Sequence, residues 1–513
     1  MPCSFVSSAA ITGLRVDMVR VEADVSTGLP MFHMVGYLSS EVKEASERVR
    51  TAICNSGIHL PPRKTVINLS PATVKKKGPS FDLPIALSVL QSAQMLPSGS
   101  LKNTLVLGEL SLDGRIRKVK GVLPILTEAA RAGYDCCILP YENVAEGALA
   151  EGIRIIGAES LGQLCRRLKG EQEAEEWSSD ISGQASGDLP EGTSVDYSDI
   201  KGQEVVKRAS EVAVAGGHNL LLLGPPGSGK SMLAARIPTI LPPLSREESM
   251  EITKIYSVMG LVDEKRPLIT DRPFRSVHHT VTKAALIGGG GIPIPGEVSL
   301  AHGGVLFLDE LAEFQRPVLE VLRQPLEERC IRLARSNGSY VFPAGFMLVA
   351  ASNPCPCGSY PDMTRCRCSP GQVEQYLGRI SQPFLDRIDI CIETPAVSYE
   401  DLKGGGAVET SAVIRKRVCH ARKIQERRYK GTKIRTNAML GGKKLEEHCR
   451  LGREEEILME QAFTALGLTA RTYHKILKVA RTIADLDGEG EIRCRHLQEA
   501  AGYRAIDKKY WRR

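Results

Sequence analysis

The amino-acid sequence predicts an α/β protein with a mixed N-terminal domain, a central domain built on a parallel sheet, and a helical C-terminal domain. Short apolar runs alternate with helical patterns over residues 1–168 and again over 197–395, whereas residues 396–513 contain few strand signals. Residues 169–196 separate the first two domains, with eight carboxylates and no Lys or Arg from Glu171 to Asp196. Because such a segment buries little apolar surface, we expect a flexible acidic linker there.

The composition excludes several classes of protein. Of 513 residues, 42% are hydrophobic and 25% are charged, as in globular proteins, which excludes disorder, collagen and coiled coil. No apolar run approaches the roughly 18 residues of a membrane helix, and residues 1–5 lack the layout of a signal peptide. We therefore expect a cytoplasmic protein. Its net charge of +7 permits a nucleic-acid partner without requiring one.

The N-terminal domain shows both strand and helix patterns. Residues 66–69 and 104–107 are short apolar runs that predict strands. Residues 42–53 have apolar side chains at helical spacing, which predicts an amphipathic helix. We therefore expect strands and helices to alternate in this domain.

The central domain contains three continuous apolar runs, at residues 220–223, 305–308 and 346–350. Strands buried on both faces of a parallel sheet have this composition, because helices cover both sides. We therefore expect the three runs to be neighbouring strands of one sheet.

The first of these runs is followed by a phosphate-binding loop. The loop matches G-x-x-x-x-G-K-[ST] in full and precedes a helical pattern, the context that the motif requires; its residues are Gly224, Pro225, Pro226, Gly227, Ser228, Gly229, Lys230 and Ser231. The glycines let backbone N–H groups face phosphates, and the helix N-terminus adds partial positive charge. We expect ATP here, with Lys230 on the β- and γ-phosphates and Ser231 on Mg²⁺.

The second run ends in two carboxylates, Asp309 and Glu310. Asp309 is suited to orient hydrated Mg²⁺, and Glu310 to polarise the attacking water. The pair alone would be a common strand ending, but its position after a phosphate loop indicates an ATPase.

These motifs resemble those of an AAA+ ATPase. Asn353 follows the third strand run, where that superfamily has its sensor-1 residue. Residues 384–389 resemble the element that carries the arginine finger, so the resemblance implies that Arg387 reaches a neighbouring subunit's nucleotide. Arg471, at the start of a C-terminal helix, resembles the sensor-2 arginine.

Residues 272–280, 284–291 and 295–302 resemble the helix-2-insert branch of that superfamily. Within this branch, nearly the whole chain resembles the Mg-chelatase-like ComM/YifB family. The resemblance implies a Lon-protease-like (ChlI-type) α+β N-terminal domain, an AAA+ core, a helical lid and a homohexameric ring. It also implies action on single-stranded or branched DNA, because family members drive branch migration during natural transformation.

The N-terminal domain resembles a Lon protease that has lost its chemistry. Ser80 occupies the place of the nucleophile, but the position of the catalytic lysine is Leu123, with Lys118 and Lys120 out of register. A serine needs an amine within hydrogen-bonding reach to act as a nucleophile. We therefore expect a domain without proteolytic activity.

Four cysteines cluster after Asn353: Cys355, Cys357, Cys366 and Cys368. Four thiolates can surround a structural Zn²⁺, although the C-x-C spacing also leaves free or redox-active thiols open. His278 and His279 are a second pair of metal-ligand residue types, but they have no acidic partner at ligand spacing in the sequence. We expect them to be structural or to sense the nucleotide.

Two basic features suggest DNA contacts. Residues 329–341 predict a β-hairpin with Arg335 near its tip. The resemblance to related ring motors implies that this hairpin lines the pore, and the glycine run at residues 288–291 could form a second pore element. Residues 415–435 hold ten basic residues and a single acidic one. From this run we expect phosphate contacts by Arg415, Arg417, Arg422 and Lys423, although a solvated helix face remains the alternative.

The sequence thus predicts a Mg²⁺-dependent ATPase ring that acts on DNA as a helicase or branch-migration motor. A chelatase-type ATPase that remodels a metal-inserting partner is the main alternative. A Lon-like protease is disfavoured by Leu123, and a non-enzymatic scaffold by the intact nucleotide motifs.

Overall fold

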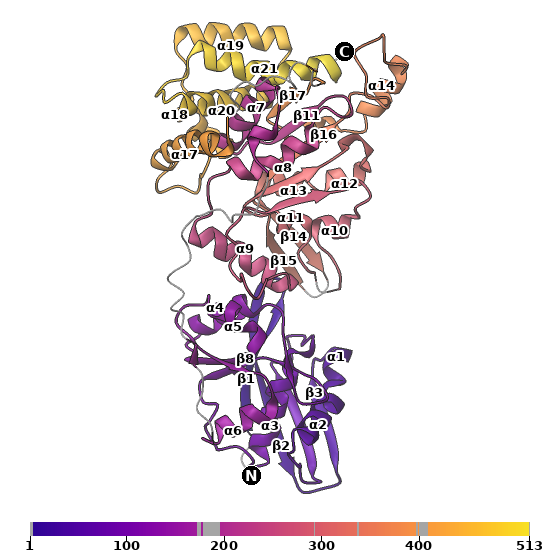
Figure 1. Ribbon diagram of the computed structural model, residues 1–513, viewed down its shortest axis with the longest axis vertical. Coiled ribbons are helices and arrows are strands. Elements are labelled where there is room, and N and C mark those ends of the chain that lie inside the picture. The colour runs from indigo at the N-terminus through magenta and orange to yellow at the C-terminus, as the bar shows by residue number, and fades with distance from the viewer. Residues whose placement is uncertain are drawn as a thin grey trace.

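The computed structural model describes residues 4–171, 176–177, 195–291, 293–335, 338–396, 399 and 409–511. Most of the acidic segment 169–196 and part of the expected hairpin turn, 336–337, lie outside these residues. The described parts form three layers along the long axis of the molecule (Figure 1). The N-terminal domain is at one end, the central domain lies in the middle, and the C-terminal helices are at the other end.

The N-terminal domain is built on an eight-stranded mixed sheet of order β10-β9-β8-β5-β1-β2-β4-β3. Its strands are β1 (Ser4–Thr12), β2 (Arg15–Ser26), β3 (Met31–Gly36), β4 (Lys64–Ser70), β5 (Thr104–Val106), β8 (Cys136–Pro140), β9 (Arg154–Ala158) and β10 (Glu176–Trp177). The strands predicted at 66–69 and 104–107 are β4 and β5. A separate small ribbon pairs β6 (Glu109–Leu110) with β7 (Ile116–Arg117).

Helices cover both faces of this sheet. One core includes residues of α2 (Ala45–Asn55), α3 (Asp82–Ser92) and α6 (Leu161–Leu168), and the other includes residues of α4 (Val122–Arg131) and α5 (Val144–Gly147). The helix predicted over 42–53 is divided into α1 (Ser40–Lys43) and α2. Glu44 between them keeps helical angles, φ −68° and ψ −17°, so the chain turns only slightly there.

The central domain contains a five-stranded parallel sheet of order β12-β13-β16-β11-β17. The strands are β11 (Leu220–Leu223), β12 (Phe274–Val277), β13 (Val305–Leu308), β16 (Met347–Ser352) and β17 (Ile390–Glu393). Alternate side chains enter different cores, so Leu220 and Leu222 pack on one face and Leu221 and Leu223 on the other. The three apolar runs are therefore neighbouring strands, as predicted.

Helices flank this sheet on both sides. They are α7 (Glu204–Gly216), α8 (Lys230–Ile240), α9 (Arg246–Met259), α10 (Lys283–Ile287), α11 (Glu297–Leu300), α12 (Arg316–Glu320), α13 (Arg323–Glu328), α14 (Pro370–Leu377) and α15 (Gln382–Leu385). The predicted hairpin is formed by β14 (Cys330–Arg335) and β15 (Gly338–Pro343), with Arg335 opposite Gly338.

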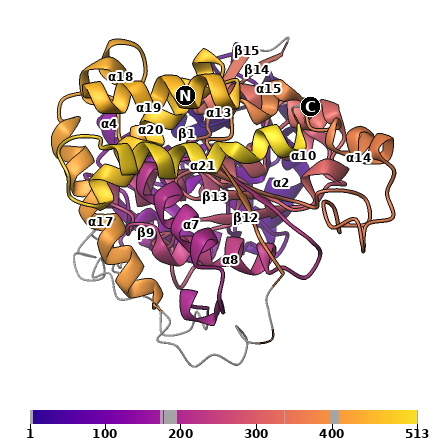
Figure 2. The same ribbon diagram turned by 90° about the horizontal axis from the view of Figure 1, so that it is seen from above.

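The C-terminal part is helical and covers one end of the central domain (Figure 2). Its helices are α17 (Ser411–Arg428), α18 (Gly442–His448), α19 (Arg453–Leu466), α20 (Ala470–Leu486) and α21 (Cys494–Tyr510). Their apolar residues join the core that also holds α7, α8 and one face of the parallel sheet. The predicted fold class is therefore confirmed. Among the described helices, none has the length and apolar character needed to cross a lipid bilayer.

The N-terminal and central domains are docked together through α4 and α9. The backbone N–H of Gly121 donates to Ser257 O at 2.9 Å, and Ser257 Oγ lies 2.5 Å from Glu146 Oε1. Glu146 also accepts a hydrogen bond from the Leu123 N–H at 3.0 Å. The two domains thus share a buried carboxylate, which holds α4 of one domain against α9 of the other.

Candidate functional site

The phosphate loop connects β11 to α8 at the carboxyl end of the sheet. Gly227 and Gly229 have φ angles of +74° and +79°, and a side chain at Gly227 would meet open space. The loop therefore exposes its backbone to a ligand. Lys230 is 8% exposed, and its Nζ lies 2.8 Å from both Gly224 O and Pro225 O. Burial lowers the pKa of Lys230, while the nearby Asp309 opposes this shift.

The two predicted carboxylates stand beside this loop. Ser231 Oγ lies 2.8 Å from Asp309 Oδ2, so the hydroxyl and the carboxylate expected to hold Mg²⁺ are adjacent. The Glu310 N–H donates to Asp309 Oδ1 at 2.9 Å. This donor set, one hydroxyl and one carboxylate next to a phosphate loop, fits Mg²⁺, which binds few protein oxygens and keeps water or phosphate as its other ligands.

Asn353 completes this group from the neighbouring strand. It follows β16, the strand between β11 and β13, and its Oδ1 lies 3.2 Å from Lys230 Nζ. The carboxyl ends of three adjacent parallel strands thus bring together Lys230, Asn353 and Asp309. Ligands bind in this position in open α/β sheets.

His279 contacts Glu310, a relationship that the sequence did not suggest. His279 follows β12, and its Nδ1 lies 3.2 Å from Glu310 Oε2. The His278 and His279 rings are 4.0 Å apart between centroids. Glu310 has a φ of +52°, in the left-handed region that L-residues adopt at a cost on the order of 1 kcal/mol. The Glu310 side chain that contacts His279 thus extends from a backbone in the left-handed conformation.

Arg387 and Arg471 lie together at the carboxylate of Glu327. Arg387 Nη2 is 2.6 Å from Glu327 Oε1, and Arg471 Nη2 is 3.6 Å from the same oxygen. The carbonyl of Arg387 accepts a hydrogen bond from Asn219, which precedes β11. The phosphate loop begins after the other end of this four-residue strand, about 13 Å away at the usual rise of a strand.

A buried ionic group fixes the Arg387 segment. Asp389 Oδ2 accepts the Asn219 N–H at 3.0 Å, and Asp389 Oδ1 lies 3.6 Å from Lys475 Nζ on α20. Burial alone would raise the pKa of Asp389, but Lys475 and His218 outweigh it and hold that pKa below its ordinary value. Burial lowers the pKa of Lys475 to about 8. This group ties the C-terminal helices to the base of β11.

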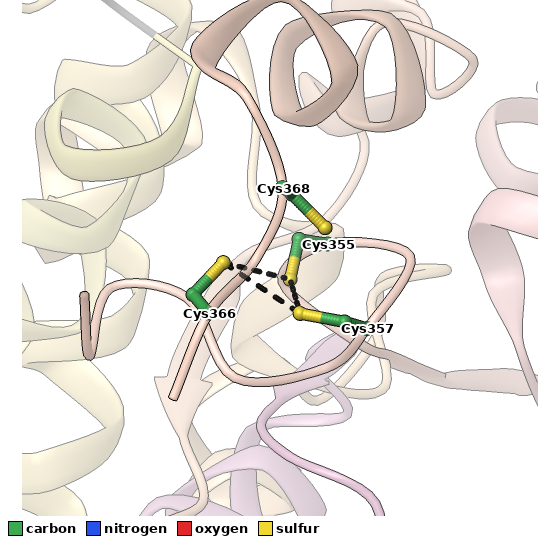
Figure 3. A group of neighbouring side chains, drawn as sticks. All are labelled: Cys355, Cys357, Cys366 and Cys368. Carbon is green, nitrogen blue, oxygen red and sulfur yellow. Dashed lines mark hydrogen bonds between the residues drawn. The ribbon is translucent and has the colours of Figure 1, made fainter. Parts of the chain in front are cut away.

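The four cysteines converge between β16 and α14 (Figure 3). The sulfur of Cys355 lies 3.4 Å from that of Cys357 and 3.8 Å from that of Cys366, and the sulfur of Cys368 is within 4.8 Å of the other three. Four sulfurs around one Zn²⁺, at a Zn–S distance of about 2.3 Å, are about 3.8 Å apart. The donor set and its spacing therefore fit a tetrahedral zinc site.

The cysteine loop packs on the phosphate loop. A side chain added at Gly358 would lie 2.3 Å from Pro226 Cδ, so the two loops are in close contact. The Tyr360 N–H donates to the Cys355 sulfur at 3.4 Å, and the Tyr360 ring meets Tyr510 of α21. The cluster thus connects the phosphate loop to the end of the C-terminal helices.

The residues at the protease-like positions of the N-terminal domain have structural contacts. Leu123 is fully buried on α4, and the Ser80 carbonyl accepts a hydrogen bond from Gly108. Lys118 pairs with Glu264 of the central domain at 3.1 Å, and the side chain of Lys120 packs against Gly260. The two nearby lysines therefore contact the central domain.

The basic run proves to be partly structural. Arg417 pairs with Glu211 and Glu409, each at 2.6 Å, and Arg422 donates to the Val214 carbonyl at 2.7 Å. Burial lowers the pKa of Arg422 to about 9. These two arginines therefore have internal partners, and their contact with DNA stays a prediction.

Other basic residues remain accessible. Lys423 and Arg335 are exposed and Arg415 is half-buried. Arg335 donates to the neighbouring Ala334 carbonyl at 3.2 Å. The exposed Lys423 and Arg335 and the half-buried Arg415 therefore stay candidates for phosphate contacts.

Three family models match the chain. Residues 196–402 match the model described as magnesium chelatase, subunit ChlI. Residues 21–143 match subunit ChlI of Mg-chelatase, and residues 408–504 match the C-terminal part of magnesium chelatase subunit ChlI. The matches cover all three layers of the structure.

Full-length relatives are also similar. The chain is 42% identical to the uncharacterized protein YifB of Salmonella typhimurium over 514 residues, covering 99% of this chain and 98% of the relative. It is 42% identical to the competence protein ComM of Haemophilus influenzae over 509 residues, with the same coverage of each chain. A partial match, 30% identical over 198 residues, joins 34% of this chain to 35% of Lon protease 2 of Bacillus subtilis.

Proposed function

Because this chain belongs to the Mg-chelatase-like ComM/YifB family of AAA+ ATPases, we propose that it is a Mg²⁺-dependent ring motor that acts on DNA. The observation that carries the proposal is the meeting of Lys230, Ser231, Asp309 and Asn353 at the carboxyl end of the parallel sheet. The substrate of this site is ATP.

Each residue of the site has a separate task. Lys230 binds the β- and γ-phosphates, and Ser231 and Asp309 hold Mg²⁺, which neutralises phosphate charge when it is bound. Glu310 accepts the proton of the attacking water. Asn353 orients both Lys230 and the γ-phosphate, since its amide already touches the lysine.

Arg387 and Arg471 act on the nucleotide of a neighbouring subunit. Their position at the amino end of β11, together on Glu327, supports this role, because neither lies beside its own phosphate loop. An arginine supplied in trans stabilises the charge of the transition state. The proposal therefore requires a ring, which we expect to be a homohexamer.

DNA, single-stranded or branched, is the proposed track. The printed description of the Haemophilus relative as a competence protein supports it, and so do the accessible Arg335, Arg415 and Lys423. Such side chains bind phosphates without reading sequence. The chelatase names of the family models favour the second candidate, an ATPase that remodels a metal-inserting partner.

The cysteine cluster is proposed to hold one structural Zn²⁺. Four cysteines leave no open coordination position, so the metal would stabilise the loop and take no part in catalysis. Because Gly358 of the cysteine loop contacts Pro226 of the phosphate loop, the metal would also stabilise the position of the phosphate loop.

The decisive experiment is the ATPase rate with and without single-stranded, duplex and branched DNA. A motor couples hydrolysis to its track, so we expect DNA to raise the rate, and the effect to weaken with salt as counterions compete for phosphates. A flat response to all three DNAs, from protein shown to be hexameric, would favour the chelatase-type candidate.

A further inference from the structure

A cavity of about 540 Å³ opens where the N-terminal domain meets the β14–β15 hairpin. Residues from both sides line it, among them Arg15, Tyr37, Thr73, Lys75, Ser339 and Val341. Those from the N-terminal domain come from the β1–β2 turn, the segment after β3 and the loop after β4. The hairpin supplies its second strand, β15.

The N-terminal side of this cavity is basic and carries an aromatic ring. The Arg15 side chain is 80% exposed, and Asp17, 2.8 Å away, fixes its direction. Lys75 Nζ lies 5.7 Å from the centre of the Tyr37 ring, and Tyr37 is 46% exposed. The Lys76 N–H donates to the Tyr37 carbonyl at 2.9 Å, which holds lysine and ring side by side.

The hairpin side of the cavity also carries basic side chains. Arg332 stands opposite Val341, and Arg335 stands opposite Gly338, so both arginines flank cavity residues across the hairpin. Arg332 is paired with Glu328 at 3.2 Å but is 61% exposed. Basic side chains therefore run from the N-terminal domain onto the hairpin.

The two sides of the cavity are in direct contact. Gly13, at the tip of the β1–β2 turn with a φ of +70°, is buried under the hairpin, and a side chain there would lie 3.2 Å from Tyr340 and 3.4 Å from Phe342. A larger residue would therefore separate the turn from the hairpin. The wall formed by Arg15 and the hairpin therefore belong to one packed unit.

We infer that this cavity is a binding site for single-stranded DNA, to which the N-terminal domain contributes Arg15, Lys75 and Tyr37. Sites for single strands combine cations that follow the phosphates with aromatic rings on which bases stack. Hydroxyls such as those of Thr73 and Ser339 add further phosphate donors. The inference rests on the proposed action on DNA, and it gives the protease-like domain a new role as part of the DNA path.

The test compares two full-length variants with the same loss of charge. Arg15→Gln/Lys75→Gln removes both cavity cations, whereas Arg63→Gln/Lys102→Gln removes two exposed cations elsewhere in the same domain. The affinity of each for a fluorescent oligo(dT) is measured by anisotropy over a salt series. Losing two phosphate contacts should lower the log–log salt slope by about 1.4, and the affinity at low salt about tenfold, relative to the control.

A second measurement does not depend on any substitution in the cavity. Wild-type protein is photo-cross-linked to an oligonucleotide that contains 4-thiothymidine, and the modified peptides are mapped by mass spectrometry. Cross-links in the peptides of Tyr37 or Lys75 are expected.

Equal affinities and slopes for the two variants, or cross-links confined to other peptides, would overturn the inference while DNA-stimulated ATPase left the proposed function intact. Wild-type protein that neither binds oligo(dT) nor responds to DNA would overturn both.

Discussion

Glu310 and Lys230 lie in one site but affect different steps. Lys230→Ala should abolish ATP binding, because the ammonium is the cation that the loop presents to the phosphates. Glu310→Gln should keep binding and lose hydrolysis, because an amide cannot accept the proton of water. Nucleotide affinity by calorimetry and turnover by phosphate release separate the two effects. Retained turnover in Glu310→Gln would show that another group activates the water.

His279 is expected to control the direction of the Glu310 carboxylate. His279 Nδ1 lies 3.2 Å from that carboxylate, and we expect this contact to restrain the direction of Glu310. His279→Ala should therefore raise the DNA-independent ATPase rate several-fold and reduce the ratio of stimulated to basal rates. His279→Asn, which keeps a hydrogen-bonding side chain, serves as the control and should restore the ratio. Equal ratios in wild type and His279→Ala would leave the histidine a structural role only.

Site residues that directly follow a strand were predictable from the sequence. Partners that come from distant segments of the chain were not. Asp309 and Asn353 follow apolar strands directly, so parallel-strand geometry alone brings them to the phosphate loop. Glu327 carries no motif, and its pairing with Arg387 and Arg471 depends on how three distant segments fold together. The same holds for His279, which lies 31 positions before Glu310 in the sequence.

The cysteine loop is the element whose ligand can be measured directly. Protein purified without chelator under reducing conditions should contain about one zinc per chain. Cys366→Ser should lower the zinc content and weaken ATP binding, because the loop that carries Gly358 would no longer be held against Pro226. Cys330→Ser, at a cysteine outside the cluster, is the matched control. Metal analysis that finds no zinc would reject the site.

The ionic group at the base of β11 gives a prediction about stability. Asp389→Asn leaves Lys475 buried without its counter-ion and should lower the free energy of unfolding by about 3 kcal/mol, whereas Asp389→Asn/Lys475→Met should recover much of it. Because the pKa of Asp389 is held below its ordinary value, its contribution is present above about pH 4 and is lost as the pH falls further. Urea unfolding of wild type and double variant should therefore converge at low pH.

Strands β11 and β13 of the central sheet were predictable because each is a continuous apolar run. The packing of α17 was not predictable, because it depends on tertiary contacts. The four-residue strands β11 and β13 are continuous apolar runs, which only a sheet covered on both faces explains. By contrast, α17 looked like a basic surface helix, but Arg417 and Arg422 turn toward α7. Charge composition alone could not distinguish the solvent side of that helix from the side that packs against α7.

For the whole molecule, the position of Arg387 predicts complementation between subunits. Arg387→Ala should bind ATP but hydrolyse it slowly. A mixture with Glu310→Gln protein should regain part of the activity, because some interfaces combine an intact Arg387 with an intact Glu310. ATPase assays over a range of mixing ratios, after subunit exchange, test this. Activity that never exceeds the sum of the two variants would indicate that the arginine acts within its own subunit.

The docking of the N-terminal domain was not predictable, because it depends on a carboxylate shared across the boundary. Glu146 binds both Leu123 and Ser257, and Gly13 fits under the hairpin. Neither residue belongs to a motif. Leu123, at the position where the resemblance to Lon proteases would place a catalytic lysine, lies on α4, which packs against α9 of the central domain.

If Arg387 and Arg471 act in trans as proposed, their contact with Glu327 has a consequence for the activity of an isolated subunit. Both arginines contact Glu327 in this structure, so under the proposed ring mechanism we expect an isolated subunit to hydrolyse ATP slowly. When subunits assemble, the nucleotide of the neighbouring subunit would compete with Glu327 for Arg387 and Arg471. We therefore expect a low ATPase rate in a pair of subunits and a high rate in a closed ring. The ATP turnover per chain should therefore rise steeply as the protein concentration increases. ATP would then be hydrolysed mainly by subunits that have assembled into a ring.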